Sequence, residues 1–232
     1  MHLGLIGGIG PAATGVYYQK LVAAMRSRGL PLELTIANAD VTTLVGNALA
    51  DRREDQAQVY AKHLTQLRDA GAEIATITSL GGHFCFENTK AISPLPLLSG
   101  VAPLDDYFAR NGIKSIGILG TEVVMRTQLY GQLEKTRAVV PADDLDVLGQ
   151  HYLDVGTSGV CTQAQREVFF DAGRRMITDQ GADAVLLGGT DLFLAFDGFD
   201  TGYPVIDALD VHVDVLAQLA ANEISLSDVG LS

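Results

Sequence analysis

Residues 71–79 read GAEIATITS, and residues 181–189 read GADAVLLGG. The two stretches align without a gap, and each follows a segment with the periodicity of an amphipathic helix. Each is a mostly apolar run that ends in small or polar residues. Such a run is typical of a parallel strand buried on both faces of a sheet. We therefore predict two equivalent strands in two similar halves of the chain.

The first strands of the two halves match as well. Residues 3–8 read LGLIGG, and residues 116–121 read IGILGT. The first strand begins 67 residues before the second in one half (Gly4 to Gly71) and 64 residues before it in the other (Gly117 to Gly181). The predicted fold class is α/β, with two Rossmann-like parallel-sheet domains related by pseudo-twofold symmetry and an active-site cleft between them.

Residues 94–103, PLPLLSGVAP, interrupt the strand and helix pattern with prolines and a glycine, and we place the seam there. The last helical segment, residues 208–224, has no strand after it and is expected to pack on the first half. We therefore expect one α/β domain from residues 1–98 plus 206–232 and a second from residues 99–205.

Composition narrows the class of partner. The 232 residues are 47% hydrophobic and carry a formal charge of −12, which argues against nucleic acid and anionic membranes. No apolar run approaches the roughly 18 residues that a membrane span requires, and the start, MHLGLIGG, does not resemble a signal peptide. We expect a cytoplasmic protein. Cys85 and Cys161 have no metal-ligand spacing, so we expect no metal.

Residues 7–14, GGIGPAAT, contain the glycine spacing of a dinucleotide-binding turn at Gly8 and Gly10. Pro11, however, has no N–H to offer a pyrophosphate, and the acidic residues downstream, Glu33 and Asp40, end no clear second strand of the right kind. The sequence therefore disfavours a nicotinamide or flavin enzyme. The glycines could also serve only to permit tight turns between strands and helices.

Hydroxyl side chains recur at the predicted strand ends, and a tight-turn role alone does not explain them. They belong to Thr14, Ser79, Thr121 and Thr190. The backbone N–H groups at the start of a helix already favour an anion, and nearby hydroxyls can add hydrogen bonds to it. The pattern predicts a site for a small carboxylate.

Three segments resemble the aspartate/glutamate racemase family of cofactor-independent amino-acid racemases. They are GLIGGIGPAAT at residues 4–14, GIKSIGILGTEVVMRTQLY at 112–130 and YPVIDALDVHV at 203–213. The family carries paired catalytic cysteines in motifs like ACNTxH and LGCTE. This sequence has TSLGGH and LGGTD instead, so the resemblance places Ser79 and Gly189 at the two cysteine positions. It implies no cofactor.

The resemblance implies a set of site residues. The catalytic positions are Ser79 and Gly189, and the substrate-binding residues are Gly8, Gly10, Thr14, Leu80, Gly81, Gly82, Thr121, Thr190 and Asp191. Racemisation without pyridoxal phosphate needs one acid/base on each face of the substrate, and thiols suit this role. Serine needs a neighbouring base, and glycine offers no group. Two-thiol racemisation is therefore not expected.

Other residues could replace the thiols. Cys85 is expected to pack in the helix after Ser79, and Cys161 to lie at or just before a helix start. For His83 and His212, a structural role is at least as consistent with the pattern as proton transfer. Asp191 stands where the family has a glutamate and could orient a water or an amino group.

Recognition of a dicarboxylic substrate is open as well. Relatives often carry a lysine where this chain has Thr157, and the available cations are Arg52, Arg53 and Arg126. We expect a small carboxylate or amino acid as ligand, and we leave a homodimer open. The alternatives are a non-catalytic carboxylate or amino-acid binder, and an isomerase or lyase with relocated acid/base groups. Relatives that decarboxylate arylmalonates keep a cysteine at the second position, so Gly189 argues against that branch.

Overall fold

The structure is a computed structural model that describes residues 1–231. The chain divides into two compact units. Unit 1 contains Met1–Gly100 and the chain from His212 onward, and unit 2 contains Val101–Val211. The sequence had placed these two boundaries after residues 98 and 205. Helix α10 (Ala208–Ala220) contains the second boundary, and the 3₁₀ helix η4 (Leu226–Val229) follows it.

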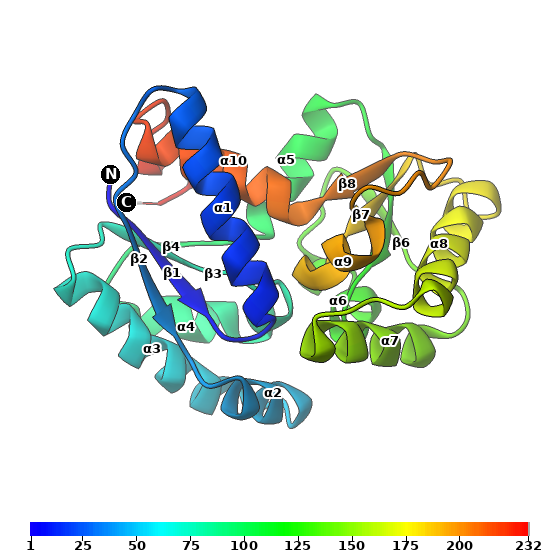
Figure 1. The fold of residues 1–232 in the computed structure, drawn as a ribbon, viewed down its shortest axis with the longest axis horizontal. Coiled ribbons are helices and arrows are strands. Elements are labelled where there is room, and N and C mark those ends of the chain that lie inside the picture. Colours follow the sequence, from blue (N-terminus) through cyan, green and yellow to red (C-terminus); the bar gives the residue numbers. More distant parts are fainter. Residues whose placement is uncertain (232) are drawn as a thin grey trace. The chain divides into compact units, whose positions relative to one another are not determined.

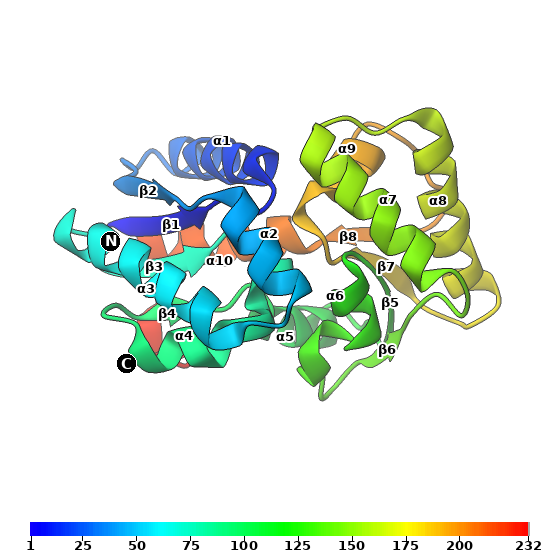
Figure 2. The same ribbon diagram turned by 90° about the horizontal axis from the view of Figure 1, so that it is seen from below.

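Unit 1 is built on a four-stranded parallel sheet with the order β2-β1-β3-β4. The chain forms β1 (Leu3–Gly7), α1 (Pro11–Ser27), β2 (Leu34–Asn38), α2 (Val41–Leu49), α3 (Arg53–Asp69), β3 (Ile74–Ile77), η1 (Gly81–Cys85), α4 (Phe86–Ile92) and β4 (Leu97–Leu98). Figures 1 and 2 show α1 and α10 on one face of this sheet and α3 and α4 on the other.

Unit 2 is also built on a four-stranded parallel sheet, with the order β6-β5-β7-β8. Its elements are α5 (Ala102–Arg110), β5 (Ser115–Leu119), α6 (Glu122–Arg126), η2 (Leu129–Gly131), β6 (Arg137–Val139), α7 (Leu145–Ser158), α8 (Gln163–Thr178), β7 (Ala184–Leu187), η3 (Thr190–Leu192), α9 (Phe193–Phe196) and β8 (Val205–Asp207). In sequence order the two sheets have the same strand pattern. The predicted parallel α/β fold class is confirmed.

The two inner strands of each sheet are fully buried, as their continuous apolar sequences predicted. Each sheet has a glycine where a helix packs closely on its first strand. A Cβ added at Gly4 would lie 3.1 Å from Leu67 of α3, and one added at Gly117 would lie 3.1 Å from Met176 of α8. These glycines let a helix approach the sheet in each unit.

The sequence pattern missed three strands. Strands β4, β6 and β8 have only two or three residues each, too few to show an apolar pattern. The segment after β2 forms two helices, α2 and α3. The break lies at Asp51, whose φ of 48° is left-handed and cannot continue a helix.

Candidate functional site

The candidate site residues gather at the carboxyl ends of the inner strands of each sheet. In unit 1, β1 leads to Gly8 and Gly10, and β3 leads to Ser79 and the glycines after it. In unit 2, β5 leads to Thr121, and β7 leads to residues 189–191. Neighbouring parallel strands end at the same edge of a sheet, so each unit brings together its own set of predicted residues.

In unit 1, the turn after β1 depends on two glycines. Gly8 has a φ of 144°, and a Cβ there would lie 2.6 Å from the carbonyl oxygen of Ala39. Gly10 caps α1 in a left-handed conformation, with φ 69°. Asp40, one of the acidic residues weighed above for a dinucleotide site, is the N-cap of α2 and accepts a hydrogen bond from the Thr43 N–H at 2.8 Å. This turn is a tight passage from strand to helix.

The hydroxyl proton of Thr14 is used in a hydrogen bond within unit 1. Thr78 donates its hydroxyl proton to the carbonyl of Ile6 at 3.0 Å, and the Thr14 and Thr78 oxygens lie 2.9 Å apart. Because a hydroxyl carries one proton, Thr14 must be the donor to Thr78. Its side chain can therefore accept a hydrogen bond, but it has no proton to offer a carboxylate.

Ser79 is buried two residues after the end of β3. Its Oγ accepts a hydrogen bond from the Gly82 N–H at 3.3 Å. The nearest candidate base is His83, which donates from Nδ1 to the Ser79 carbonyl at 2.7 Å and accepts at Nε2 from the Gly100 N–H at 2.9 Å. Burial lowers the pKa of His83 to about 4. A neutral ring with both nitrogens occupied cannot take the serine proton.

The residues after Ser79 are packed closely. The Leu80 side chain is buried, 3.0 Å from where a Cβ on Gly100 would lie. Gly81 and Gly82 begin the 3₁₀ helix η1. A Cβ on Gly82 would lie 2.6 Å from the Tyr60 hydroxyl oxygen, so Gly82 makes room for a tyrosine that sequence analysis did not identify.

Tyr60 is held by a chain of buried amides. Gln56 donates to its hydroxyl at 3.0 Å, and Asn47 donates to the Gln56 carbonyl at 3.0 Å. Arg52, a half-exposed side chain, donates in turn to Asn47 at 3.0 Å. These residues lie on α2 and α3 and between them, far in sequence from Ser79, and no short motif marks them. They fix the wall against which η1 packs.

In unit 2, Thr121 accepts a hydrogen bond at the start of a helix. It is the N-cap of α6, and its Oγ accepts from the Val124 N–H at 3.2 Å. The side chain is partly exposed. Among the described residues it acts as a hydrogen-bond acceptor, so its hydroxyl proton can point to a bound group. The role of Thr121 as a hydroxyl donor to a ligand stays a prediction, whereas the Thr14 proton is used within unit 1.

Gly189 lies at the position after β7 that corresponds to Ser79 after β3. A Cβ on Gly189 would lie 2.2 Å from Cε2 of Tyr152, a distance that no two such carbons adopt. Tyr152 lies on α7, is 3% exposed and donates its hydroxyl proton to Oδ2 of Asp191 at 3.2 Å. Sequence analysis missed Tyr152, although the glycine at 189 was itself a sign that something occupies this space.

Thr190 and Asp191 follow Gly189 in η3 and are both buried, with side chains 1% and 2% exposed. Burial, followed by the nearby Asp191 carboxylate, raises the pKa of Tyr152 well above its ordinary value. The phenol is therefore protonated at neutral pH and acts as a donor. The tip of β7 presents glycine backbone, with a tyrosine packed against it.

Two other candidate proton carriers, His212 and Cys85, are buried and hydrogen-bonded within the protein. Thr76 donates to the Leu98 carbonyl at 2.9 Å, so His212 donates to Thr76 from Nε2 and accepts from the Tyr17 hydroxyl at Nδ1. Burial lowers the pKa of His212 to about 3. Cys85 is fully buried, and burial raises its pKa to about 11. Neither group is a base at neutral pH.

The remaining candidates have partners on the surface. Arg53 pairs with Asp51 at 2.9 Å, and Arg126 pairs with Glu122 and Asp146. Thr157 donates to a carbonyl of its own helix, that of Leu153, at 2.7 Å. Cys161, expected at or just before a helix start, directly precedes Thr162, the N-cap of α8. Burial raises its pKa, so it is a thiol.

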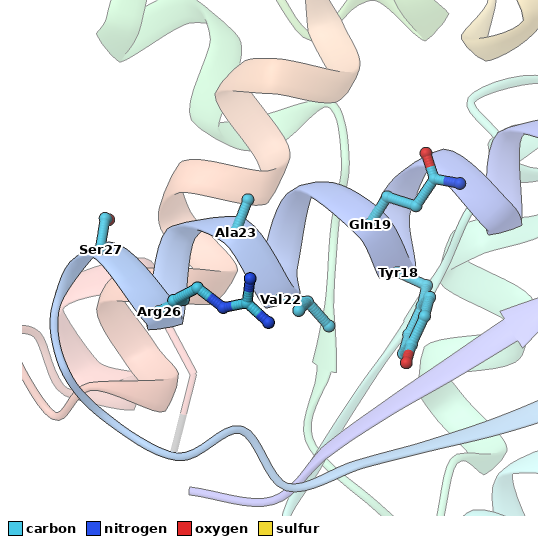
Figure 3. A pocket seen from close by; sticks show the side chains of 6 residues that line it. All are labelled: Tyr18, Gln19, Val22, Ala23, Arg26 and Ser27. Atoms are coloured by element: carbon cyan, nitrogen blue, oxygen red, sulfur yellow. The ribbon is translucent and has the colours of Figure 1, made fainter.

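A groove runs along the outer face of α1, with a volume of about 450 Å³. Figure 3 shows the side chains that line it: Tyr18, Gln19, Val22, Ala23, Arg26 and Ser27. The groove contains no predicted site residue. Within residues 1–231, no group of three or more His, Cys, Asp or Glu side chains could hold a metal ion. No helix among these residues is long and apolar enough to cross a membrane.

Known proteins resemble this chain in sequence and in structure. The sequence profile of the Asp/Glu/Hydantoin racemase family matches residues 6–216. Among solved structures, an aspartate racemase homologue from Pyrococcus horikoshii has a TM-score of 0.79 at 24% identity, covering 95% of this chain and 99% of its own. The aspartate racemase of Picrophilus torridus has a TM-score of 0.75 at 17% identity, covering 95% of this chain and 95% of its own. The glutamate racemase of Thermus thermophilus has a TM-score of 0.61 at 16% identity, covering 96% of this chain and 81% of its own.

Proposed function

The chain belongs to the Asp/Glu/Hydantoin racemase family, and on that premise we propose that it binds a small carboxylate or amino acid without two-thiol racemisation. The ligand binds at the carboxyl ends of the inner strands, where the predicted site residues gather. Ser79 and Gly189 stand at the positions that the family resemblance assigns to the catalytic cysteines. No cofactor takes part in this proposal.

One observation carries the proposal: the positions after β3 and β7 correspond in the two sheets, and neither offers an acid/base. Ser79 has a hydroxyl, and both nitrogens of the neighbouring His83 are engaged by backbone groups. Gly189 has no side chain, and the Tyr152 ring lies where one would begin. Proton removal on one face and return on the other needs a basic group at each position.

The contacts also disfavour relocated acid/base groups. His83, His212 and Cys85 are buried, and their shifted pKa values leave two neutral imidazoles and a neutral thiol. Asp191 is engaged by Tyr152. The names of the solved relatives, aspartate and glutamate racemases, support an amino-acid carboxylate as the ligand class.

Substitution of Thr121 tests the proposed carboxylate binding. We expect calorimetric titration with a panel of amino acids, dicarboxylic acids and keto acids to find a ligand for the wild type. Thr121→Val should then weaken binding by roughly tenfold to hundredfold, because a hydrogen bond to a charged group is lost. Thr121→Ser keeps the hydroxyl and should keep most of the affinity.

The control is Thr178→Val. The Thr178 hydroxyl bonds to its own helix end, through the Arg174 carbonyl and Asp179. This variant should bind like the wild type. If Thr121→Val also binds like the wild type, the ligand does not use Thr121. If no carboxylate binds and a dinucleotide does, the proposed function is wrong.

A further inference from the structure

The backbone at Gly189 does not require glycine. Its φ of −126° and ψ of 119° are an extended conformation that any residue adopts. The restriction comes from one side chain, because the three atoms closest to an added Cβ all belong to Tyr152. They are Cε2 at 2.2 Å, Cζ at 2.8 Å and Cδ2 at 3.0 Å. With Tyr152 in this place, residue 189 cannot carry a side chain.

Tyr152 is fixed in this position from both ends. Its ring is buried on α7, and its hydroxyl donates to Asp191 Oδ2 at 3.2 Å. Gly156 lies one helical turn further along α7, and a Cβ there would lie 3.3 Å from the same oxygen. The glycine lets the carboxylate come close to the helix. A ring held by packing and by a hydrogen bond cannot swing away at little cost.

We propose that Tyr152 restricts residue 189 to glycine at the β7 strand end, where its ring occupies the space of a side chain at residue 189 and its hydroxyl holds Asp191. This inference rests on the proposed function for the claim that a ligand reaches this strand end. It implies that the ligand meets glycine backbone backed by a tyrosine, which limits its size on this side. It also implies that a cysteine at residue 189 fits only if Tyr152 on α7 is replaced by a smaller residue.

A cycle of variants tests the assignment by thermal unfolding, with no ligand present. Gly189→Cys should lower the unfolding midpoint because the thiol and the ring compete for one space. Tyr152→Ala should lower it by about 10 °C through the cavity that it leaves. The double variant should lose clearly less than the sum of the two single losses, because the cysteine enters the cavity.

Tyr152→Phe is the matched control. It keeps the ring, so Gly189→Cys should be as damaging in that background as in the wild type. If Tyr152→Ala fails to fold, Tyr152→Leu takes its place in the cycle.

Additive losses in the cycle would overturn the assignment, and so would a Gly189→Cys protein as stable as the wild type. Rescue of Gly189→Cys by Tyr152→Phe would do the same. None of these readings depends on a ligand. If no carboxylate binds the wild type but the cycle shows coupling, the proposed function fails and the role of Tyr152 at residue 189 stands.

Discussion

At the residue scale, Ser79 differs from a catalytic serine in what surrounds it. The imidazole four residues away donates to the serine carbonyl and accepts from a second backbone group. Sequence could place His83 near Ser79, but it could not show which atoms of the two residues meet. That depends on where Gly100 lies, and β4 and the loop after it bring Gly100 to the ring.

The burial of the neutral His83 ring predicts how the stability of the protein depends on pH. His83 has a pKa of about 4 in the folded chain and about 6.5 when unfolded. Below pH 6.5 the unfolded chain takes up a proton that the folded chain does not. Stability is therefore highest above that pH and falls as the pH drops toward 4. We expect the free energy of unfolding to be lower by about 2 kcal/mol at pH 5 than at pH 7.5 from this residue.

Urea unfolding at the two pH values measures this effect. His83→Asn costs stability, but it removes one of the two buried titrating rings and should reduce the pH dependence by about 2 kcal/mol, while the buried ring of His212 keeps its own contribution. His63→Asn is the control, because that ring lies on the helix surface and bonds to Gln66. An unchanged pH dependence in His83→Asn would contradict a buried, neutral His83.

At the element scale, the long inner strands could be predicted from the sequence and the short strands could not. Continuous apolar runs predicted β1, β3, β5 and β7, because a strand buried on both faces needs such a run. The short strands β4, β6 and β8 gave no such signal, although β4 brings the loop with Gly100 to His83. The sequence likewise located Ser79 and Gly189 after equivalent strands. It could not reveal Tyr152, whose place depends on how α7 packs.

The ends of β5 and β7 in unit 2 approach each other closely at Gly120 and Gly188, and this gives a prediction. A Cβ on Gly120 would lie 2.9 Å from the backbone carbonyl of Gly188, which has no flexible end that could move away. Gly120→Ala should therefore destabilise the protein by about 1–3 kcal/mol. Gly15→Ala is the matched control, since nothing lies within 4 Å of a Cβ there.

The two alanine variants should differ in sign. Gly15 is inside α1, where alanine is better than glycine by up to about 1 kcal/mol. Chemical denaturation of both variants measures the difference. Equal effects would mean that the β5 and β7 ends are not packed as described.

At the scale of the whole molecule, the fold and the family membership are shown, while the loss of racemisation is our proposal. Composition predicted a folded α/β protein with a strongly negative charge, and repeated motifs predicted the sheets. Function depends on a few side chains at the strand ends, and these are the positions where the chain departs from the family motifs. A family profile that matches residues 6–216 is therefore compatible with a loss of racemisation.

The central claim is that a ligand binds and keeps its α-proton. The most direct measurement follows the Cα–H signals of aspartate, glutamate and every amino acid found to bind, by proton NMR in deuterated water with the wild-type protein. We predict no exchange above the rate in buffer alone, because neither Ser79 nor Gly189 can act as a base. Loss of the Cα–H signal in the presence of the wild type, abolished by Ser79→Ala or Cys85→Ala, would contradict the account.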